Sequence, residues 1–337
     1  MEKSDKLPND FKSLIVRKNS FNKCTIHLEK TQLKIVNENE IVIKVFYSSL
    51  NYKDILVCNG TYWDCRNYPV IPGIDAAGIV IKSYSKKFKC GDKVIVIARP
   101  AGSKHPGGLS QYLKVPSEWA DKLPNKMSLK ESMIFGTAGF TAALAIHKLL
   151  EGGVKRSNLP ILVSGATGGV GVLSIYMLSK LGFRVCASTG KPNKKKFLEK
   201  IGADEVLDHN QFKNISDLSL QRIRYAAIID SVGGDIISSG SRQLAIGGKI
   251  ISLGMMSKPN CNLNLTPFIL RGIEIIGLHA ESSTATLRKF IWKKISKFSK
   301  DSGLKNLYRE CKLSNVKNSI KKFGKNTRIG RIIVRID

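Results

Sequence analysis

A glycine-rich turn between an apolar run and a helical pattern is the feature of this sequence that points most directly to chemistry. Residues 160–178 read Pro-Ile-Leu-Val-Ser-Gly-Ala-Thr-Gly-Gly-Val-Gly-Val-Leu-Ser-Ile-Tyr-Met-Leu, and Gly165, Gly168 and Gly171 stand three residues apart. Glycine is needed where a chain turns tightly or where backbone approaches a pyrophosphate, and the N–H groups that begin the next helix then bind phosphate oxygens. The position between a strand and a helix makes the pattern specific. The sequence therefore predicts a dinucleotide site, with a turn built for packing alone as the alternative.

The strand after this turn distinguishes between the two nicotinamide cofactors. Proteins that bind NAD place an Asp or Glu about 20 residues beyond the glycine turn on the ribose 2′-hydroxyl, whereas NADP binders offer cations to the 2′-phosphate. Residues 184–191 read Arg-Val-Cys-Ala-Ser-Thr-Gly-Lys and contain no acid. Thr189, Gly190 and Lys191 supply a hydroxyl, an approachable backbone and a cation, so NADPH is the expected cofactor. The alternative, that lysines here only solvate the next helix, fits Lys195 and Lys196 better than Lys191.

A second group of reactive side chains occupies residues 48–54, directly after a strand-like run. Its members can orient a substrate or transfer a proton. They are the amide of Asn51, the phenol of Tyr52, the amine of Lys53 and the carboxylate of Asp54. Two glycine-containing segments follow, Pro-Val-Ile-Pro-Gly-Ile-Asp-Ala-Ala-Gly at 69–78 and Gly-Thr-Ala-Gly-Phe-Thr-Ala at 136–142.

Two patterns of apolar residues along the chain indicate the strands and helices that must position these groups. Before Pro124, alternating or β-branched runs predict a β-rich domain, with strands at 13–16, 40–47, 77–82, 93–97 and 110–115. A helix is expected over 128–150, because Ser128 and Glu131 form a capping box. Six short strand-like runs follow, at 161–164, 184–188, 205–207, 226–230, 249–253 and 273–278. Helical patterns such as those at 170–181 and 192–201 lie between them. This alternation predicts an α/β fold with a doubly wound parallel sheet, and a late strand at 331–336 is expected to pair with the first domain.

Composition limits the class of protein. The chain has 337 residues, of which 42% are hydrophobic and 24% charged, which is typical of a globular protein. No apolar run is expected to reach the ~18 residues of a membrane span, and the start lacks the apolar core of a signal peptide. Seven scattered cysteines show neither C-x-x-C spacing nor a zinc cluster. A cytoplasmic location without membrane attachment is therefore expected.

The net charge of +29 is the least typical property of the chain. Residues 282–337 hold 16 Lys+Arg and 3 Asp+Glu, but the lysines around 289–300 alternate with apolar residues as on the polar face of an amphipathic helix. No zinc-finger spacing, aromatic RNA-binding signature or recognition helix is apparent. We expect no dedicated nucleic-acid partner, although a nucleic-acid-binding protein with this charge is kept as one alternative.

Together with the glycine turn, the segments at 48–54, 69–78 and 136–142 resemble the medium-chain dehydrogenase/reductase superfamily over essentially the whole chain. The resemblance implies a GroES-like catalytic domain (1–127 with 282–337) and a Rossmann cofactor domain (128–281). Zinc-dependent members carry a Cys near the position of Tyr52 and Gly-His-Glu where this chain has Gly73-Ile74-Asp75. The chain therefore resembles the zinc-free quinone and enoyl reductase branch, and no metal is expected.

The same segments, with Thr-Pro-Phe-Ile-Leu-Arg-Gly at 266–272, resemble the acrylyl-CoA reductase (NADPH) family, whose relatives are often described as quinone oxidoreductases. The resemblance implies reduction of acrylyl-CoA, an acyl-CoA substrate, and a homodimer formed by edge pairing of Rossmann sheets. The residues that it implies for NADPH contact are Tyr52, Thr167, Gly168, Gly169, Val170, Thr189, Gly190, Lys191, Leu253, Ile269 and Asn326.

The expected mechanism is conjugate reduction, because an activated C=C bond accepts hydride at Cβ while its carbonyl takes up negative charge. Tyr52 is the candidate proton donor to Cα or orients the nicotinamide, with water as another proton source. Asn51 is a candidate for a hydrogen bond to the ribose or the carbonyl, and Asp54 for tuning Tyr52, although a structural role of Asp54 stays open. An NADPH-dependent quinone or small-enone oxidoreductase is the alternative activity.

Overall fold

The computed structural model describes residues 10–33, 36–213, 218–323 and 329–337. It divides into two compact units, unit 1 (Met1–Thr137 with Thr284–Asp337) and unit 2 (Ala138–Ser283). The domain limits expected from the sequence lie somewhat earlier in the chain. Helix α2 (Leu129–Glu151) accounts for the difference, because it begins in unit 1 and ends in unit 2.

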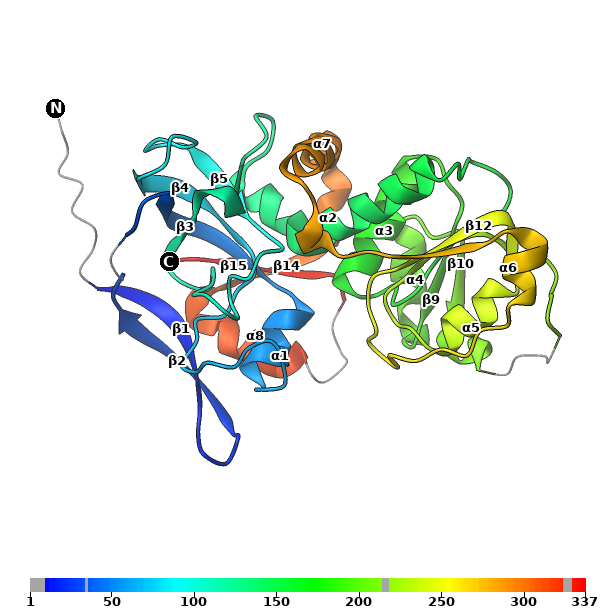
Figure 1. Cartoon of the computed structure of the whole chain (residues 1–337), viewed down its shortest axis with the longest axis horizontal. Coiled ribbons are helices and arrows are strands. Elements are labelled where there is room, and N and C mark those ends of the chain that lie inside the picture. Colours follow the sequence, from blue (N-terminus) through cyan, green and yellow to red (C-terminus); the bar gives the residue numbers. More distant parts are fainter. Residues whose placement is uncertain (1–9, 34–35, 214–217, 324–328) are drawn as a thin grey trace. The chain divides into compact units, whose positions relative to one another are not determined.

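Unit 1 contains a seven-stranded sheet in the order β14-β15-β3-β4-β5-β7, with β6 pairing β3, and a separate two-stranded hairpin (Figure 1). The sheet consists of β3 (Glu40–Leu50), β4 (Ala76–Ser83), β5 (Lys93–Val96), β6 (Tyr112–Pro116), β7 (Ala120–Lys122), β14 (Tyr308–Lys312) and β15 (Arg331–Arg335), and the hairpin of β1 (Phe11–Lys18) and β2 (Cys24–Thr31). The late strand β15 pairs antiparallel with β3 and parallel with β14. The prediction that it joins the first domain is therefore confirmed.

Besides the first part of α2, unit 1 contains the helices α1 (Tyr52–Cys58), α7 (Ala285–Ile295) and α8 (Val316–Phe323). In α7 the apolar Ile291 and Trp292 are buried while Lys289 is exposed, as the amphipathic pattern predicted. Arg288 of the same helix is fully buried and donates hydrogen bonds to Asp121 and to the carbonyl of Ile97. This side chain ties α7 to the strands beneath it.

Helix α2 begins with the predicted capping box, since Glu131 N donates to Ser128 Oγ (3.1 Å) and Ser128 N donates to the Glu131 carboxylate (2.7 Å). The helix is interrupted at Gly136, whose φ of 49° and ψ of −153° are not helical. By length and hydropathy α2 passes the test for a membrane span, contrary to the sequence-based expectation. However, 78% of its most apolar window is buried within the fold, which is typical of a core helix.

Unit 2 contains a six-stranded parallel sheet in the order β10-β9-β8-β11-β12-β13. Its strands are β8 (Ile161–Val163), β9 (Val185–Thr189), β10 (Glu205–Asp208), β11 (Tyr225–Asp230), β12 (Leu244–Ser252) and β13 (Glu274–Gly277), and its helices are α3 (Gly169–Lys180), α4 (Lys195–Lys200), α5 (Asp235–Ser241) and α6 (Thr266–Arg271). The strand order reverses direction between β8 and β11, which is the switch point where α/β sheets bind ligands. The predicted α/β class, with one Rossmann-type sheet and one β-rich domain, is confirmed.

Several short elements escaped the sequence analysis, among them β2, β14, α1, α5 and α8. Helix α1 has seven residues and follows an Asn that resembles a turn residue. Elements of this length depend on tertiary packing, because local propensity alone is too weak to stabilise them.

Candidate active-site network and cofactor turn

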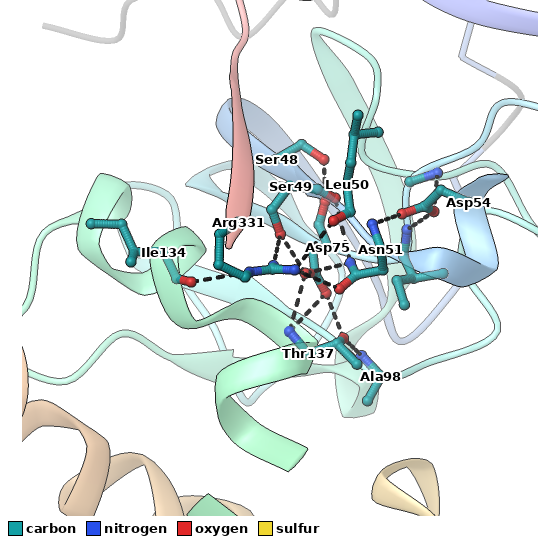
Figure 2. A network of polar contacts seen from close by, with 12 residues as sticks. Ser48, Ser49, Leu50, Asn51, Asp54, Asp75, Ala98, Ile134, Thr137 and Arg331 are labelled. Atoms are coloured by element: carbon teal, nitrogen blue, oxygen red, sulfur yellow. Dashed lines mark hydrogen bonds and ion pairs between the residues drawn. The ribbon is translucent and has the colours of Figure 1, made fainter. Parts of the chain in front are cut away.

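A buried ion pair lies at the centre of unit 1. The Arg331 side chain (1% exposed) places Nη2 3.3 Å from Oδ2 of Asp75 (0% exposed), as Figure 2 shows. The Asp75 carboxylate also accepts hydrogen bonds from Ser49 Oγ (2.5 Å), Asn51 Nδ2 (2.8 Å) and both the N–H and the hydroxyl of Thr137. A buried carboxylate needs such partners, because an uncompensated charge away from water is costly.

The remaining donors of Arg331 extend the network. Nε donates to the carbonyl of Ile134, Nη1 to the carbonyl of Leu50 and to Asn51 Oδ1 (3.0 Å), and Nη2 to Ser49 Oγ (2.6 Å). Burial lowers the pKa of Arg331 while Asp75 opposes that shift. Arginine remains charged in proteins, so this side chain is a fixed cation that joins β3, α2 and β15.

Asp54 is a second fully buried carboxylate, at the start of α1. Its Oδ2 accepts from Asn51 N (2.8 Å), and its Oδ1 accepts from the N–H groups of Gly73 (3.1 Å) and Ile74 (2.9 Å). Burial, with a smaller contribution from the charge of Asp75, raises the pKa of Asp54 to about 7. The carboxylate therefore connects the first turn of α1 to the segment before β4.

Glycine makes this packing possible at two positions. A Cβ on Gly136 would lie 2.7 Å from Arg331 Nη2 and closer still to the Asp75 carboxylate. A Cβ on Gly73, whose φ is +111°, would lie 2.5 Å from the backbone nitrogen of Leu109. The missing side chain of Gly136 therefore makes room for the Asp75–Arg331 pair, and that of Gly73 makes room for the backbone at Leu109.

The network determines where Tyr52 and Asn51 stand. Asn51 is the N-cap of α1 and is 8% exposed, and its side-chain amide is held by Arg331 and Asp75. Tyr52 is the next residue, the first of α1, and is 44% exposed. The structure thus brings Asn51 and Asp54 into one buried network and leaves Tyr52 at its edge, where a ligand has access to the ring.

In unit 2 the glycine turn connects β8 to α3 as predicted. Gly168 is the N-cap of α3, and Gly165 has a φ of +56° that favours glycine. A Cβ on Gly171 would collide with the carbonyl of Gly165, so α3 packs directly against the turn. Gly169 and Val170 are the first residues of α3, where backbone N–H groups have no acceptor within the helix.

The predicted 2′-phosphate residues follow β9. Thr189 is buried, Gly190 is exposed, and Lys191 is half-buried with its N–H donating to Thr189 Oγ1 (3.1 Å). The ring of His209 lies against the turn, because a Cβ on Gly190 would stand 3.4 Å from its Nδ1. The structure therefore brings the three predicted residues together at the end of one strand.

Leu253 lines an open pocket of ≈ 440 Å³ within unit 2. Ile269 is 76% exposed on α6. Asp230 caps the turn after β11, since its carboxylate accepts from Ser164 Oγ and from the N–H groups of Val232 and Gly233. Asn326 lies outside the described residues.

The sequence analysis missed four residues of the buried network: Ser49, Asp75, Thr137 and Arg331. Asp75 was part of a recognised segment without a role, and Arg331 stood at the start of an apolar strand. An arginine that opens an otherwise buried strand and an aspartate within Pro-Gly-Ile-Asp are the only signals, and neither reveals the other.

Comparisons with known proteins agree with this architecture. Residues 37–125 match the family described as "Alcohol dehydrogenase GroES-like domain", and residues 169–297 match the family described as "Zinc-binding dehydrogenase". The chain is 35% identical to "Putative quinone oxidoreductase YhfP" of Bacillus subtilis, over 97% of this chain and 99% of that protein. It is 32% identical to "Probable acrylyl-CoA reductase AcuI" of Escherichia coli, over 89% of this chain and 92% of that protein.

Two solved structures superpose on almost the whole chain. The crystal structure of Escherichia coli YhdH with bound NADPH has a TM-score of 0.91 at 30% identity and covers 96% of this chain and 100% of that one. The crystal structure of Bacillus subtilis yhfP with NAD bound has a TM-score of 0.92 at 34% identity and covers 97% of this chain and 100% of that one.

The zinc that one of the matched family descriptions implies finds no donor set among the residues that the structure describes. In residues 10–33, 36–213, 218–323 and 329–337, no group of three or more His, Cys, Asp or Glu side chains is placed to hold a metal ion. The Asp75 carboxylate is occupied by Arg331 and hydrogen-bond donors, and Ile74 beside it has no ligand atom. The two family matches, with relatives aligned along nearly the whole length, place the chain in the medium-chain dehydrogenase/reductase superfamily, in the branch of the relatives named acrylyl-CoA reductase AcuI and putative quinone oxidoreductase YhfP.

Proposed function

We propose that this oxidoreductase reduces the C=C bond of acrylyl-CoA: acrylyl-CoA + NADPH + H⁺ → propanoyl-CoA + NADP⁺. NADPH supplies the hydride that adds at Cβ of the acryloyl group. A proton adds at Cα, and the thioester carbonyl carries negative charge between these events, so hydrogen-bond donors near that oxygen accelerate the reaction.

The cofactor is held by unit 2. The turn and first helical residues Thr167–Val170 bind the pyrophosphate, because the N–H groups at the start of α3 have no partner within the helix. Thr189, Gly190 and Lys191 bind the ribose 2′-phosphate through a hydroxyl, a backbone N–H and a cation. Leu253 and Ile269 add apolar contacts, as the resemblance implies.

Tyr52 is the proposed catalytic residue, as proton donor to Cα or by orienting the nicotinamide. Asn51 and Asp54 act through it as positioning residues, because both hold the first turn of α1 on which Tyr52 stands. A contact of Asn51 with the ribose or the carbonyl requires its amide to leave Asp75 and Arg331, so the buried network favours the positioning role.

The observation that carries the proposal is the buried Asp75–Arg331 pair, which lies in the catalytic domain of a chain 32% identical to a protein named probable acrylyl-CoA reductase. The Asp75 carboxylate and the Arg331 guanidinium bind each other, and the described residues offer no donor set for a metal. A substrate that activates its own double bond suits such a site. An α,β-unsaturated thioester has that property, because its carbonyl stabilises the charge that hydride addition creates.

The test is NADPH consumption by the purified protein with acrylyl-CoA, beside crotonyl-CoA, a simple quinone and an NADH control. Turnover of acrylyl-CoA with preference for NADPH is expected. Tyr52→Phe then examines the proton donor, with a fall in kcat of about 10²-fold expected if the phenol transfers the proton. Absence of thioester reduction by wild-type protein would reject the proposal.

A quinone or small enone is the second candidate substrate, because the 35% identical relative is named a putative quinone oxidoreductase. Reduction of the quinone without reduction of acrylyl-CoA in the same assay would assign this activity. The homodimer formed by edge pairing of Rossmann sheets and the cytoplasmic location stay predictions, to be tested by sedimentation and by cell fractionation.

A further inference from the structure

An indole side chain stands in solvent on the surface of unit 1. Trp63 is 75% exposed, whereas Trp292 in the same unit is 2% exposed. Its position is fixed, because the N–H groups of Thr61 and Tyr62 donate to the carbonyl of Leu56, and Cys65 is buried. The loop therefore holds a large aromatic surface in solvent, where a flat ring can stack on it.

This indole is connected to the α1 segment that carries Tyr52. The rings of Tyr62 and Trp63 have centroids 5.9 Å apart, and Nζ of Lys53 lies 5.0 Å from the Tyr62 ring centroid. Lys53 directly follows Tyr52 in α1. A strip of side chains therefore runs from the exposed indole through the Tyr62 ring to the ammonium group of Lys53, and Lys53 is the neighbour in sequence of the proposed catalytic tyrosine.

The strip is positively charged. Arg66 is exposed three residues beyond Trp63, and Lys104 Nζ lies 2.9 Å from Oδ1 of Asp64. Lys53, Arg66 and Lys104 contribute three positive charges against the one negative charge of Asp64, which leaves +2. We call Lys53, Tyr62, Trp63, Arg66 and Lys104 the Trp63 surface.

We infer that the Trp63 surface binds the 3′-phosphoadenosine diphosphate end of coenzyme A. This ligand combines a flat adenine ring with several phosphate charges, which is the chemistry that an exposed indole among cations recognises. The adenine stacks on Trp63, and Arg66 and Lys53 contact phosphate oxygens, Arg66 with the forked geometry that suits them. The strip then leads the pantetheine arm toward Tyr52. The inference rests on the proposed acyl-CoA substrate and adds the residues that recognise its nucleotide end.

The experiment is calorimetric titration of the full-length enzyme with coenzyme A in saturating NADP⁺. The bound NADP⁺ keeps the adenine nucleotide of coenzyme A out of the cofactor turn. We expect Trp63→Ala to raise the Kd about tenfold, Trp63→Phe to restore most of the affinity, and Arg66→Ala to raise the Kd about tenfold as well. Phe21→Ala is the matched control, because Phe21 is 88% exposed at the tip of the β1–β2 hairpin. An equal Kd for Trp63→Ala, Phe21→Ala and wild type, or no binding of coenzyme A by wild type, would overturn the inference.

A second readout separates this inference from the proposed function. Each variant is assayed with acrylyl-CoA and with acryloyl-N-acetylcysteamine, a thioester without the nucleotide. The kcat/KM for acrylyl-CoA divided by the kcat/KM for acryloyl-N-acetylcysteamine should fall about tenfold in Trp63→Ala and stay constant in Phe21→Ala. Reduction of both thioesters with an unchanged ratio would overturn the Trp63 surface and leave the reductase intact. Failure to reduce either thioester would reject the reductase, while the titration still decides whether the surface binds coenzyme A. Tighter binding of a random oligonucleotide than of coenzyme A, abolished by Trp63→Ala, would also overturn the inference.

Discussion

Replacing Arg331 by methionine removes the cation from the buried network while keeping much of its volume. The change leaves Asp75 buried with its charge and deprives the carbonyls of Leu50 and Ile134 of their donor. Removing one partner of a buried ion pair costs about 3–5 kcal/mol, because the remaining charge is no longer compensated. Four neutral donors to Asp75, from the three residues Ser49, Asn51 and Thr137, stay in place and limit the loss. We therefore expect Arg331→Met to lose about 4 kcal/mol of unfolding free energy.

Urea unfolding followed by circular dichroism measures this loss, with Arg309→Met as the matched control. Arg309 lies exposed on β14, the strand that pairs with β15, so its replacement should change stability by less than about 0.5 kcal/mol. The double variant Arg331→Met with Asp75→Asn removes both charges, and it should lose at least about 1 kcal/mol less than the sum of the single losses. A loss for Arg331→Met equal to that of Arg309→Met, or strict additivity in the double variant, would refute the reasoning.

Three further outcomes follow from the same contacts. Folding raises the pKa of Asp54 from 3.8 to about 7, so the folded state binds the extra proton and the stability that Asp54 contributes should fall as pH rises from about 4 to about 7. Asp54→Asn should lack that slope when urea midpoints are compared across this pH range, and parallel profiles would contradict the shift. Gly136→Ala should lower the thermal midpoint more than Gly153→Ala, since both have positive φ but the added Cβ has open space only at residue 153; equal midpoints would remove the steric argument. Lys191→Ala should weaken NADPH binding about tenfold and NADH binding far less, with Lys195→Ala as control, measured by cofactor fluorescence. Equal weakening of both cofactors would exclude a contact with the 2′-phosphate.

The parts of the fold that sequence reasoning recovered are those set by local pattern. The glycine turn after β8, the capping box of Ser128 and Glu131, and the six strands of unit 2 each depend on residues close together in sequence. Apolar runs bounded by turn residues and glycines at fixed spacing have few alternative interpretations. For this reason the sequence alone predicts the cofactor turn.

The buried network was beyond that reasoning because its members are far apart in the chain. Arg331 and Asp75 are separated by 256 positions, and an arginine at the start of a strand reads as a solvated end. Charged residues are rarely buried unless paired, so predicting one buried member requires knowing the other. Trp63 was missed for a related reason, since an exposed tryptophan and a core tryptophan look alike in sequence.

The network also explains why the C-terminal strand matters to the proposed site. The chain leaves unit 1 after Thr137 and returns at Thr284, and Arg331 comes from the part that returns. The carboxylate of Asp75 and the amide of Asn51 both take a partner from Arg331, and Asn51 caps the helix that begins with Tyr52. Strand β15 brings the guanidinium to this point only by pairing with β3. Pairing of β15 with β3 therefore completes the sheet in unit 1 and also positions the proposed catalytic tyrosine. The Arg331 guanidinium links these two effects, because it pairs with the buried Asp75 and holds Asn51 at the start of α1.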